Sequence, residues 1–149
     1  MYKRQILKGT YRLPRNRHDS HEALYALPKQ LHDRGIRFAI AGEGPGYPGG
    51  ASNVRNLAYH AGAAVAHGLS REDAVQSITG TAAEILGLDD RVGTLTIGHD
   101  ATLVVTDGDI LESLTQVTHA FVQGRAVDLN NRHRQLFDKY KQKPTAIEP

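Results

Sequence analysis

The clearest hydrophobic pattern in the chain lies between residues 69 and 107. Ser70 is a good N-cap residue, because its hydroxyl can accept a hydrogen bond from a backbone N–H that has no partner within the helix. Gly87 can take the positive φ of a residue that ends a helix. We therefore predict a helix and a second short helix between these two residues. Apolar side chains recur at steps of three and four, as on one buried helix face: Ala74, Val75, Ile78, Ala82, Ile85 and Leu86.

The pattern changes to a period of two after Gly87. Residues 94–97 alternate between threonine and an apolar residue, which is typical of a strand. Residues 101–106 are mostly apolar and predict a second short strand. A third strand is predicted at 117–123, with a hairpin turn at Gly124 and Arg125. A final helix is predicted within the last twenty residues.

The first part of the chain indicates two strands joined by a helix. Residues 6–14 have the composition of a strand that runs into a loop, and residues 36–42 form the best strand pattern in the chain. A helix predicted to begin at Asp19 or Ser20 lies between them, and Pro28 is predicted to kink or divide it. A strand that follows a helix through a tight link predicts a βαβ unit with parallel strands.

Composition excludes several classes of function. The 149 residues include no Cys, which excludes disulfides, thiolate metal sites and a Cys nucleophile. The net charge of +2 does not by itself predict a nucleic-acid partner, and no stretch is long and apolar enough to predict a membrane span. The basic residues nearest a possible cleft are accompanied by few aromatic residues, which argues against base stacking. These basic residues are Lys8, Arg12, Arg15 and Arg17.

An ordered motif runs from residue 68 to 107. Its positions are Gly68, Leu69, Ser70, Ala74, Thr79, Ala82, Ala83, Leu86, Gly87, Asp90, Arg91, Gly93, Leu95, Gly98, Asp100, Ala101, Leu103 and Val104. In this motif the chain resembles the amidohydrolase superfamily, and within it the imidazolonepropionase-like branch. The resemblance extends less specifically over residues 6–130.

The resemblance implies an α/β fold in three parts. Residues 6–90 would be the last βα units of a (β/α)8 TIM-type barrel, 91–128 strands of the family's composite β-sandwich, and 129–149 a C-terminal helix and tail. A complete barrel needs roughly 200 to 250 residues, so the chain is expected to be the C-terminal fragment of a longer protein. Residues 1–5, MYKRQ, match the translation of a common sequencing adapter and are expected to be an artefact.

Glu43 is the candidate catalytic and metal-binding residue. In the family the last barrel strand ends in an Asp that binds a divalent metal and accepts a proton from the attacking water. Here the strand ends in Ala41, Gly42 and Glu43, so a longer carboxylate stands in place of Asp. The resemblance implies Zn or Fe in the intact protein. The family's metal-binding histidines come from earlier strands, so the fragment is expected to bind no metal.

The glycine-rich stretch 44–52 is the second candidate. Glycine-rich backbone before a helix N-terminus can hold an anionic group, and a nearby Arg can add a bidentate contact. A purely structural loop remains the alternative. The predicted substrate-binding residues are Tyr47, Asn53, Arg55 and Asn56. His18 and His21 are not predicted to bind metal, because no HExxH pattern or third ligand accompanies them.

Two functions remain open from the sequence. The first is a fragment of a metal-dependent amidohydrolase that hydrolyses a non-peptide C–N bond of a small molecule, in a cyclic amide or similar compound. This fragment alone is expected to be inactive and to self-associate through unpaired strand edges. The alternative is a non-enzymatic, metal-free barrel relative that binds a small ligand or a partner through loop 44–52.

Overall fold

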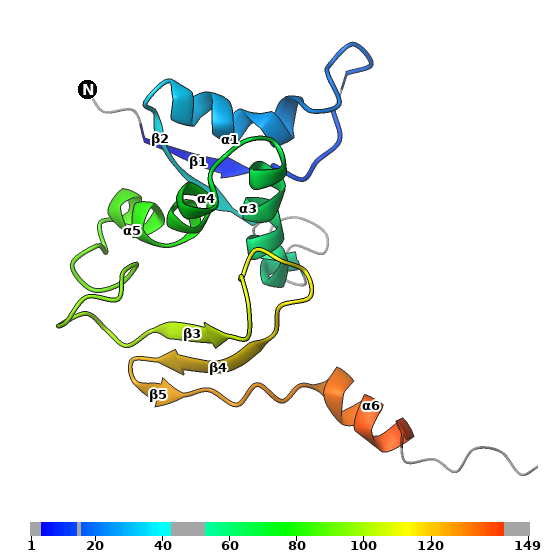
Figure 1. Ribbon diagram of the computed structural model, residues 1–149, viewed down its shortest axis with the longest axis vertical. Helices are drawn as coiled ribbons and strands as arrows, with labels where there is room; N and C mark the ends of the chain where they lie inside the picture. Colours follow the sequence, from blue (N-terminus) through cyan, green and yellow to red (C-terminus); the bar gives the residue numbers. More distant parts are fainter. Residues whose placement is uncertain (1–3, 15, 43–52, 142–149) are drawn as a thin grey trace, which may run out of the picture.

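The computed structural model describes residues 4–14, 16–42 and 53–141, which form two small sheets and a set of helices (Figure 1). In chain order the elements are β1 (Arg4–Lys8), α1 (Ala23–Asp33), β2 (Arg37–Ala41), the 3-10 helix η1 (Val54–Asn56), α3 (Leu57–Ala66), α4 (Arg71–Ile78), α5 (Gly80–Leu86), β3 (Leu103–Thr106), β4 (Val117–Val122), β5 (Arg125–Ala126) and α6 (Arg132–Lys141).

The first sheet is a parallel pair. β1 pairs with β2 in a register that places Leu7 beside Ile40, and α1 connects the two strands. This confirms the predicted βαβ unit. β1 begins earlier than predicted and ends at Lys8, because Gly9 turns the chain with a φ of 73°. Arg4 and Gln5 belong to this strand.

The core lies between β2 and the helices. Phe38 and Ile40 are 6% and 3% exposed and pack with buried residues of α3 and α4. Several of these are alanines, among them Ala61, Ala64 and Ala74. A small side chain at each of these positions lets the helix backbones approach the strand closely, which is how such short helices form one packed core.

The two predicted helices between Ser70 and Gly87 are confirmed as α4 and α5. The Ser70 hydroxyl accepts a hydrogen bond from the Asp73 N–H at 3.0 Å. Gly87 ends α5 with a φ of 69°, a conformation that costs glycine little. The helices are separate because Thr79 leaves the helical conformation, with φ and ψ of −130° and −95°.

The predicted start of α1 is wrong, and so is a division of the helix at Pro28. The helix begins at Ala23, and neither Asp19 nor Ser20 caps it; the N-cap position is occupied by Glu22 without a side-chain hydrogen bond. Pro28 does not divide the helix and is fully buried. Burial of the proline ring against the core offsets the backbone hydrogen bond that proline cannot donate.

The second sheet has the strand order β3-β4-β5 and is antiparallel. β4 and β5 form the predicted hairpin, but its two turn residues are Gln123 and Gly124, with φ of 50° and 78°. Two successive positive φ values are the geometry of the tight turns that match the twist of paired strands.

Residues 94–97 do not form the predicted strand. Leu95 and Ile97 are almost fully exposed, at 88% and 103%. A strand needs a neighbour to accept and donate its backbone hydrogen bonds, and no strand of the described residues pairs with this segment.

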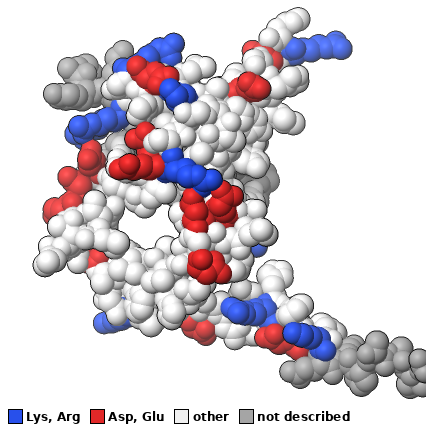
Figure 2. Space-filling model, viewed as in Figure 1, with Lys and Arg blue, Asp and Glu red and all other residues white. Residues whose placement is uncertain are grey.

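The segment between β3 and β4 joins the second sheet to the helices. The Leu111 carbonyl lies so close to α3 that a Cβ added at Gly62 would be 2.8 Å from it. Arg71, the first residue of α4, forms ion pairs with Asp109 and Glu112 of this segment. The hydrogen bond to Glu112 contributes most to raising the pKa of Arg71, and the hydrogen bond to Asp109 contributes next. On the face drawn in Figure 2, acidic and basic side chains are interspersed over the helices.

α6 extends away from the rest of the structure (Figure 1), and all of its residues are exposed. Its N-cap is Asn131, whose side-chain oxygen accepts a hydrogen bond from the Arg134 N–H at 3.0 Å. In the described part of the chain, no helix combines the length and apolarity that crossing a membrane requires.

Candidate functional site

The carboxyl ends of β1 and β2 meet at one edge of the parallel pair. Gly9 and Thr10 follow β1 at this edge, and Gly42 follows β2. A Cβ added at Gly42 would lie 3.9 Å from the Cα of Val54, so η1 begins beside the end of β2. Val54 therefore lies beside the end of β2 at this edge.

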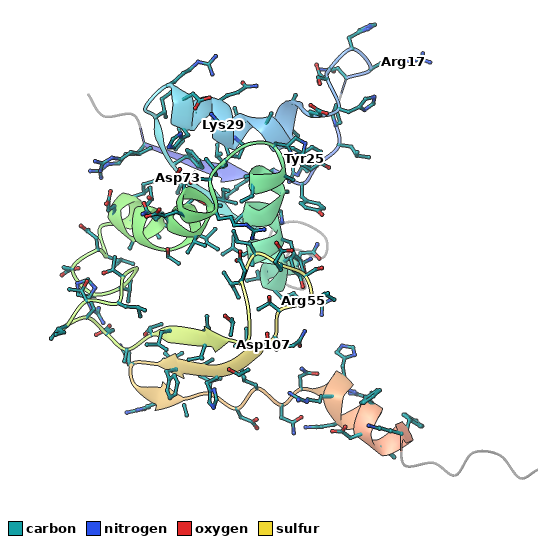
Figure 3. All side chains as sticks on the ribbon, in the orientation of Figure 1. Arg17, Tyr25, Lys29, Arg55, Asp73 and Asp107 are labelled. Carbon is teal, nitrogen blue, oxygen red and sulfur yellow. The ribbon has the colours of Figure 1, made fainter. Side chains whose placement is uncertain are left out.

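Three of the predicted substrate-binding residues lie at the start of η1 and α3, next to this edge. Asn53 and Arg55 are exposed and Asn56 is half-buried, all at the start of η1 and α3. Figure 3 shows Arg55 at the foot of α3. An amide and a guanidinium here can donate several hydrogen bonds to a polar or anionic group.

The other two predicted site residues lie outside the described residues. Glu43 directly follows Gly42, and Tyr47 belongs to the stretch 44–52. Their roles therefore stay predictions.

A buried hydrogen bond fastens the turn after β1 to α3. Thr10 and His60 are 3% and 7% exposed, and the Thr10 Oγ1 lies 3.1 Å from the His60 Nδ1. Sequence reasoning singled out neither Thr10 nor His60 as a site residue. No local signal could have paired them, because the two residues are fifty positions apart.

Aromatic rings extend this contact from α3 to α1. The ring of Tyr11 lies 5.4 Å from that of His60 and 5.9 Å from that of Tyr25. Tyr25 of α1 in turn stacks on His67, with ring centroids 5.2 Å apart. The Ala63 carbonyl lies 2.9 Å from His67 Nδ1 and accepts the hydrogen bond of that nitrogen. These contacts connect the turn after β1 to α3 and α1.

Metal ligands are not assembled among the residues described. Residues 4–14, 16–42 and 53–141 contain no group of three or more His, Asp or Glu side chains that could hold a metal ion. His18 and His21, which were not predicted to be ligands, are both exposed.

Other surface features lie away from this edge. A hollow of about 210 Å³ opens near the amino end of β2, where it is lined by His32, Arg37 and Asp73 among others. Arg17 lies in the loop before α1, far from Arg55 in Figure 3.

Comparisons with known proteins agree with this fold. The chain has a TM-score of 0.63 and 26% identity to the crystal structure of an amidohydrolase from Thermotoga maritima MSB8, covering 75% of this chain and 28% of that one. A second amidohydrolase structure, at 24% identity and a TM-score of 0.58 over 76% of this chain and 28% of that one, shows the fold alone. The chain thus spans little more than a quarter of the length of either protein.

The search of curated proteins found no match to this chain. A model of the amidohydrolase family, in contrast, matches residues 3–127, which is most of the chain. The match covers both sheets and all helices from α1 to α5. The chain belongs to the amidohydrolase family.

Proposed function

We propose that this chain is the C-terminal part of a metal-dependent amidohydrolase that hydrolyses a non-peptide C–N bond in a cyclic amide or similar small molecule. The observation that carries this proposal is the parallel β1–β2 pair, whose carboxyl ends meet beside η1 within the segment that the family model matches. Barrel enzymes place their reactive groups at the carboxyl ends of parallel strands. We interpret the pair as the last two strands of a (β/α)8 barrel.

The proposed roles follow from position and chemistry. Glu43 is the first residue past Gly42 and is the proposed proton acceptor and metal ligand, because a carboxylate can serve both functions. Asn53, Arg55 and Asn56 are proposed to orient the substrate, together with Tyr47. The intact protein is proposed to use Zn or Fe to activate water. The pattern of residues 68–107 favours the imidazolonepropionase-like branch.

The remaining metal ligands are proposed to lie in the part of the longer protein that this chain does not include. The described residues assemble no metal site of their own, and the chain corresponds to 28% of the length of the solved amidohydrolases. The 149-residue chain is therefore expected to show no hydrolase activity.

The decisive experiment uses the longer reading frame that encodes this segment. The protein is expressed, its metal content is measured, and hydrolysis is assayed on a panel of cyclic amides and cyclic ureas. Glu43→Gln is expected to lower kcat by roughly 10² to 10⁴, the range for loss of general acid–base catalysis. Glu22→Gln, a change at the exposed carboxylate in the N-cap position of α1, is the matched control.

Two outcomes would contradict the proposal in different ways. A longer protein that holds no metal and hydrolyses nothing in the panel would favour a metal-free barrel relative that binds a ligand or partner. Full activity in Glu43→Gln would leave the enzyme class standing and show that another group accepts the proton.

A further inference from the structure

The two faces of the β1–β2 pair differ in what they contact. Leu7 and Ile40 are partners in the register, and both pack in the buried cluster that includes residues of α3 and α4. Successive side chains of a strand point to opposite faces. Ile6 and Lys8 of β1 therefore lie on the face that is turned away from these helices, and both are exposed.

This second face is the interior face if the pair belongs to a barrel, so the inference rests on the proposed function. In a (β/α)8 barrel the helices surround the strands, and alternate side chains of each strand fill the interior in layers. Ile6 is paired with Ala39, which makes an apolar layer. Lys8 is paired with Ala41 in the last layer before the carboxyl ends. Lys8 thus brings a positive charge to the end of the barrel that carries the reactive groups.

The charge of Lys8 has no counter-charge in the described part of the chain. Its ammonium group forms no ion pair with a carboxylate of residues 4–14, 16–42 or 53–141. Residues 4–14 and 53–71, which approach this edge, include no Asp or Glu. Lysine is almost never enclosed in a protein without a paired charge. An ammonium group at the end of a barrel interior therefore favours an anionic partner.

Arg12 adds a second positive charge beside the end of β1. Its N–H donates a hydrogen bond to the Gly9 carbonyl at 3.0 Å, which closes the turn after the strand. The side chain lies back across this turn, because a Cβ added at Gly9 would be 2.7 Å from the Arg12 Nε. A guanidinium has five N–H donors, so it can bind a ligand and keep its interactions within the protein.

We propose that Lys8 is a substrate-binding residue of the intact enzyme and that, with Arg12 beside it, it binds an anionic group of the substrate. The substrate class is then a cyclic amide or cyclic urea that carries a carboxylate or a phosphonate next to the ring. Charge-assisted hydrogen bonds from lysine and arginine to such groups are among the stronger polar contacts in proteins.

Matched substrates test the charge. The longer protein is assayed on sets of cyclic amides and cyclic ureas that differ in one side group, which is a carboxylate, a phosphonate or a neutral carboxamide. At least one anionic member is expected to have a kcat/KM roughly 10- to 100-fold above that of the carboxamide, the range for hydrogen bonds to charged groups. Equal values for all three members of every set overturn the proposal.

Substitutions at Lys8 test the residue. Lys8→Gln is expected to lower kcat/KM for the preferred anion by roughly 10- to 100-fold more than for the carboxamide, mainly through KM. Lys8→Arg keeps the charge and is expected to recover part of this loss. Lys139→Gln, the same change on the exposed α6, is the control and should leave both values unchanged. A loss in Lys8→Gln that is equal for anionic and neutral substrates means a structural role and overturns the proposal.

Binding separates this inference from the proposed function. Isothermal titration calorimetry measures the affinity for the same three compounds after a chelator has removed any metal, so that no turnover occurs. In a protein that hydrolyses none of them, selective weakening of anion binding in Lys8→Gln supports the role of Lys8 although the proposed function fails. Hydrolysis and binding that Lys8→Gln leaves without a selective change keep the proposed function and overturn this inference.

Discussion

At the scale of single residues, the most informative contact is the one between Thr10 and His60. Both side chains are buried, and the hydrogen bond joins the turn after β1 to the first turns of α3. A buried polar group that loses its partner is costly, at about 1–3 kcal/mol. The Thr10 hydroxyl is therefore one of the groups that fasten this turn to α3.

Thr10→Val keeps the shape of the side chain and removes the hydroxyl. We expect the free energy of unfolding to fall by about 1–3 kcal/mol, because a methyl group then faces the His60 Nδ1. Urea denaturation followed by circular dichroism measures the change. Thr10→Ser retains the hydroxyl and should lose much less, and equal losses in the two variants would show that packing, not the hydrogen bond, matters here.

At the scale of elements, Gly93 sets how closely the chain after α5 packs on that helix. A Cβ at Gly93 would lie 2.7 Å from the Ala83 Cβ and 3.1 Å from the Thr79 carbonyl oxygen. Gly93 has a φ of 97°, and Gly98 has nearly the same value with nothing within 4 Å. The two glycines therefore share a backbone conformation but differ in their surroundings.

Alanine substitutions at these two positions separate strain from packing. Gly98→Ala is expected to cost about 1–2 kcal/mol, the penalty of a left-handed conformation for a residue with a Cβ. Gly93→Ala is expected to cost about 1–3 kcal/mol more, because the new methyl group collides with α5. Thermal and urea unfolding of both variants provide the comparison. Equal losses would mean that the chain after α5 shifts without resistance.

The ion pairs of Arg71 make the junction between α4 and the second sheet sensitive to acid. A hydrogen bond from the Leu111 N–H, and then the Arg71 guanidinium, hold the pKa of Asp109 below its usual 3.8. A carboxyl group with a lower pKa in the folded chain stabilises the fold most when it is ionised. This contribution is complete above pH 3.8 and is lost as the pH falls through the lower folded pKa.

Asp109→Asn should therefore lower the stability at neutral pH and reduce its decline between about pH 4 and pH 2. The decline does not vanish, because Lys29 and His32 also lower the pKa of Asp33. The measurement is the free energy of unfolding in urea across this pH range. Asp138→Asn, on the exposed α6, is the control, and an identical pH profile in both variants would contradict a role for Asp109.

At the scale of the whole molecule, α6 is separate from the core. None of its residues is buried, and Leu136, Phe137 and Tyr140 are 37%, 64% and 55% exposed. The match to the amidohydrolase family model also ends before it, at residue 127. The helix therefore contributes little to the packing of the described fold.

Deletion of residues 129–149 is expected to leave the unfolding temperature of the remaining chain unchanged. The reason is that α6, the described helix in this segment, contributes no buried residue to the core. Differential scanning calorimetry of the full and shortened chains provides the test. A fall of several degrees in the shortened chain would show that α6 packs on the core in solution.

The features that local sequence predicted well depend on residues a few positions apart. The apolar spacing within α4 and α5, the Ser70 cap and the Gly87 end are each complete within one or two helical turns. The β1–β2 pair was also predicted, because a short helix between two strands favours parallel pairing. Of the candidate site, Asn53, Arg55 and Asn56 were predicted and lie at the strand edge, whereas the Thr10–His60 contact was missed.

The amino-acid sequence by itself determined the family, the order of most elements and the ends of the central helices, because those signals are local or follow an ordered motif. Tertiary structure alone decided whether an alternating segment became a strand. Residues 94–97 and 101–106 were both predicted to be strands, yet only the second segment, which contains β3, has β4 beside it. A strand's hydrogen bonds come from residues far along the chain, so only the assembled fold selects which segment forms one.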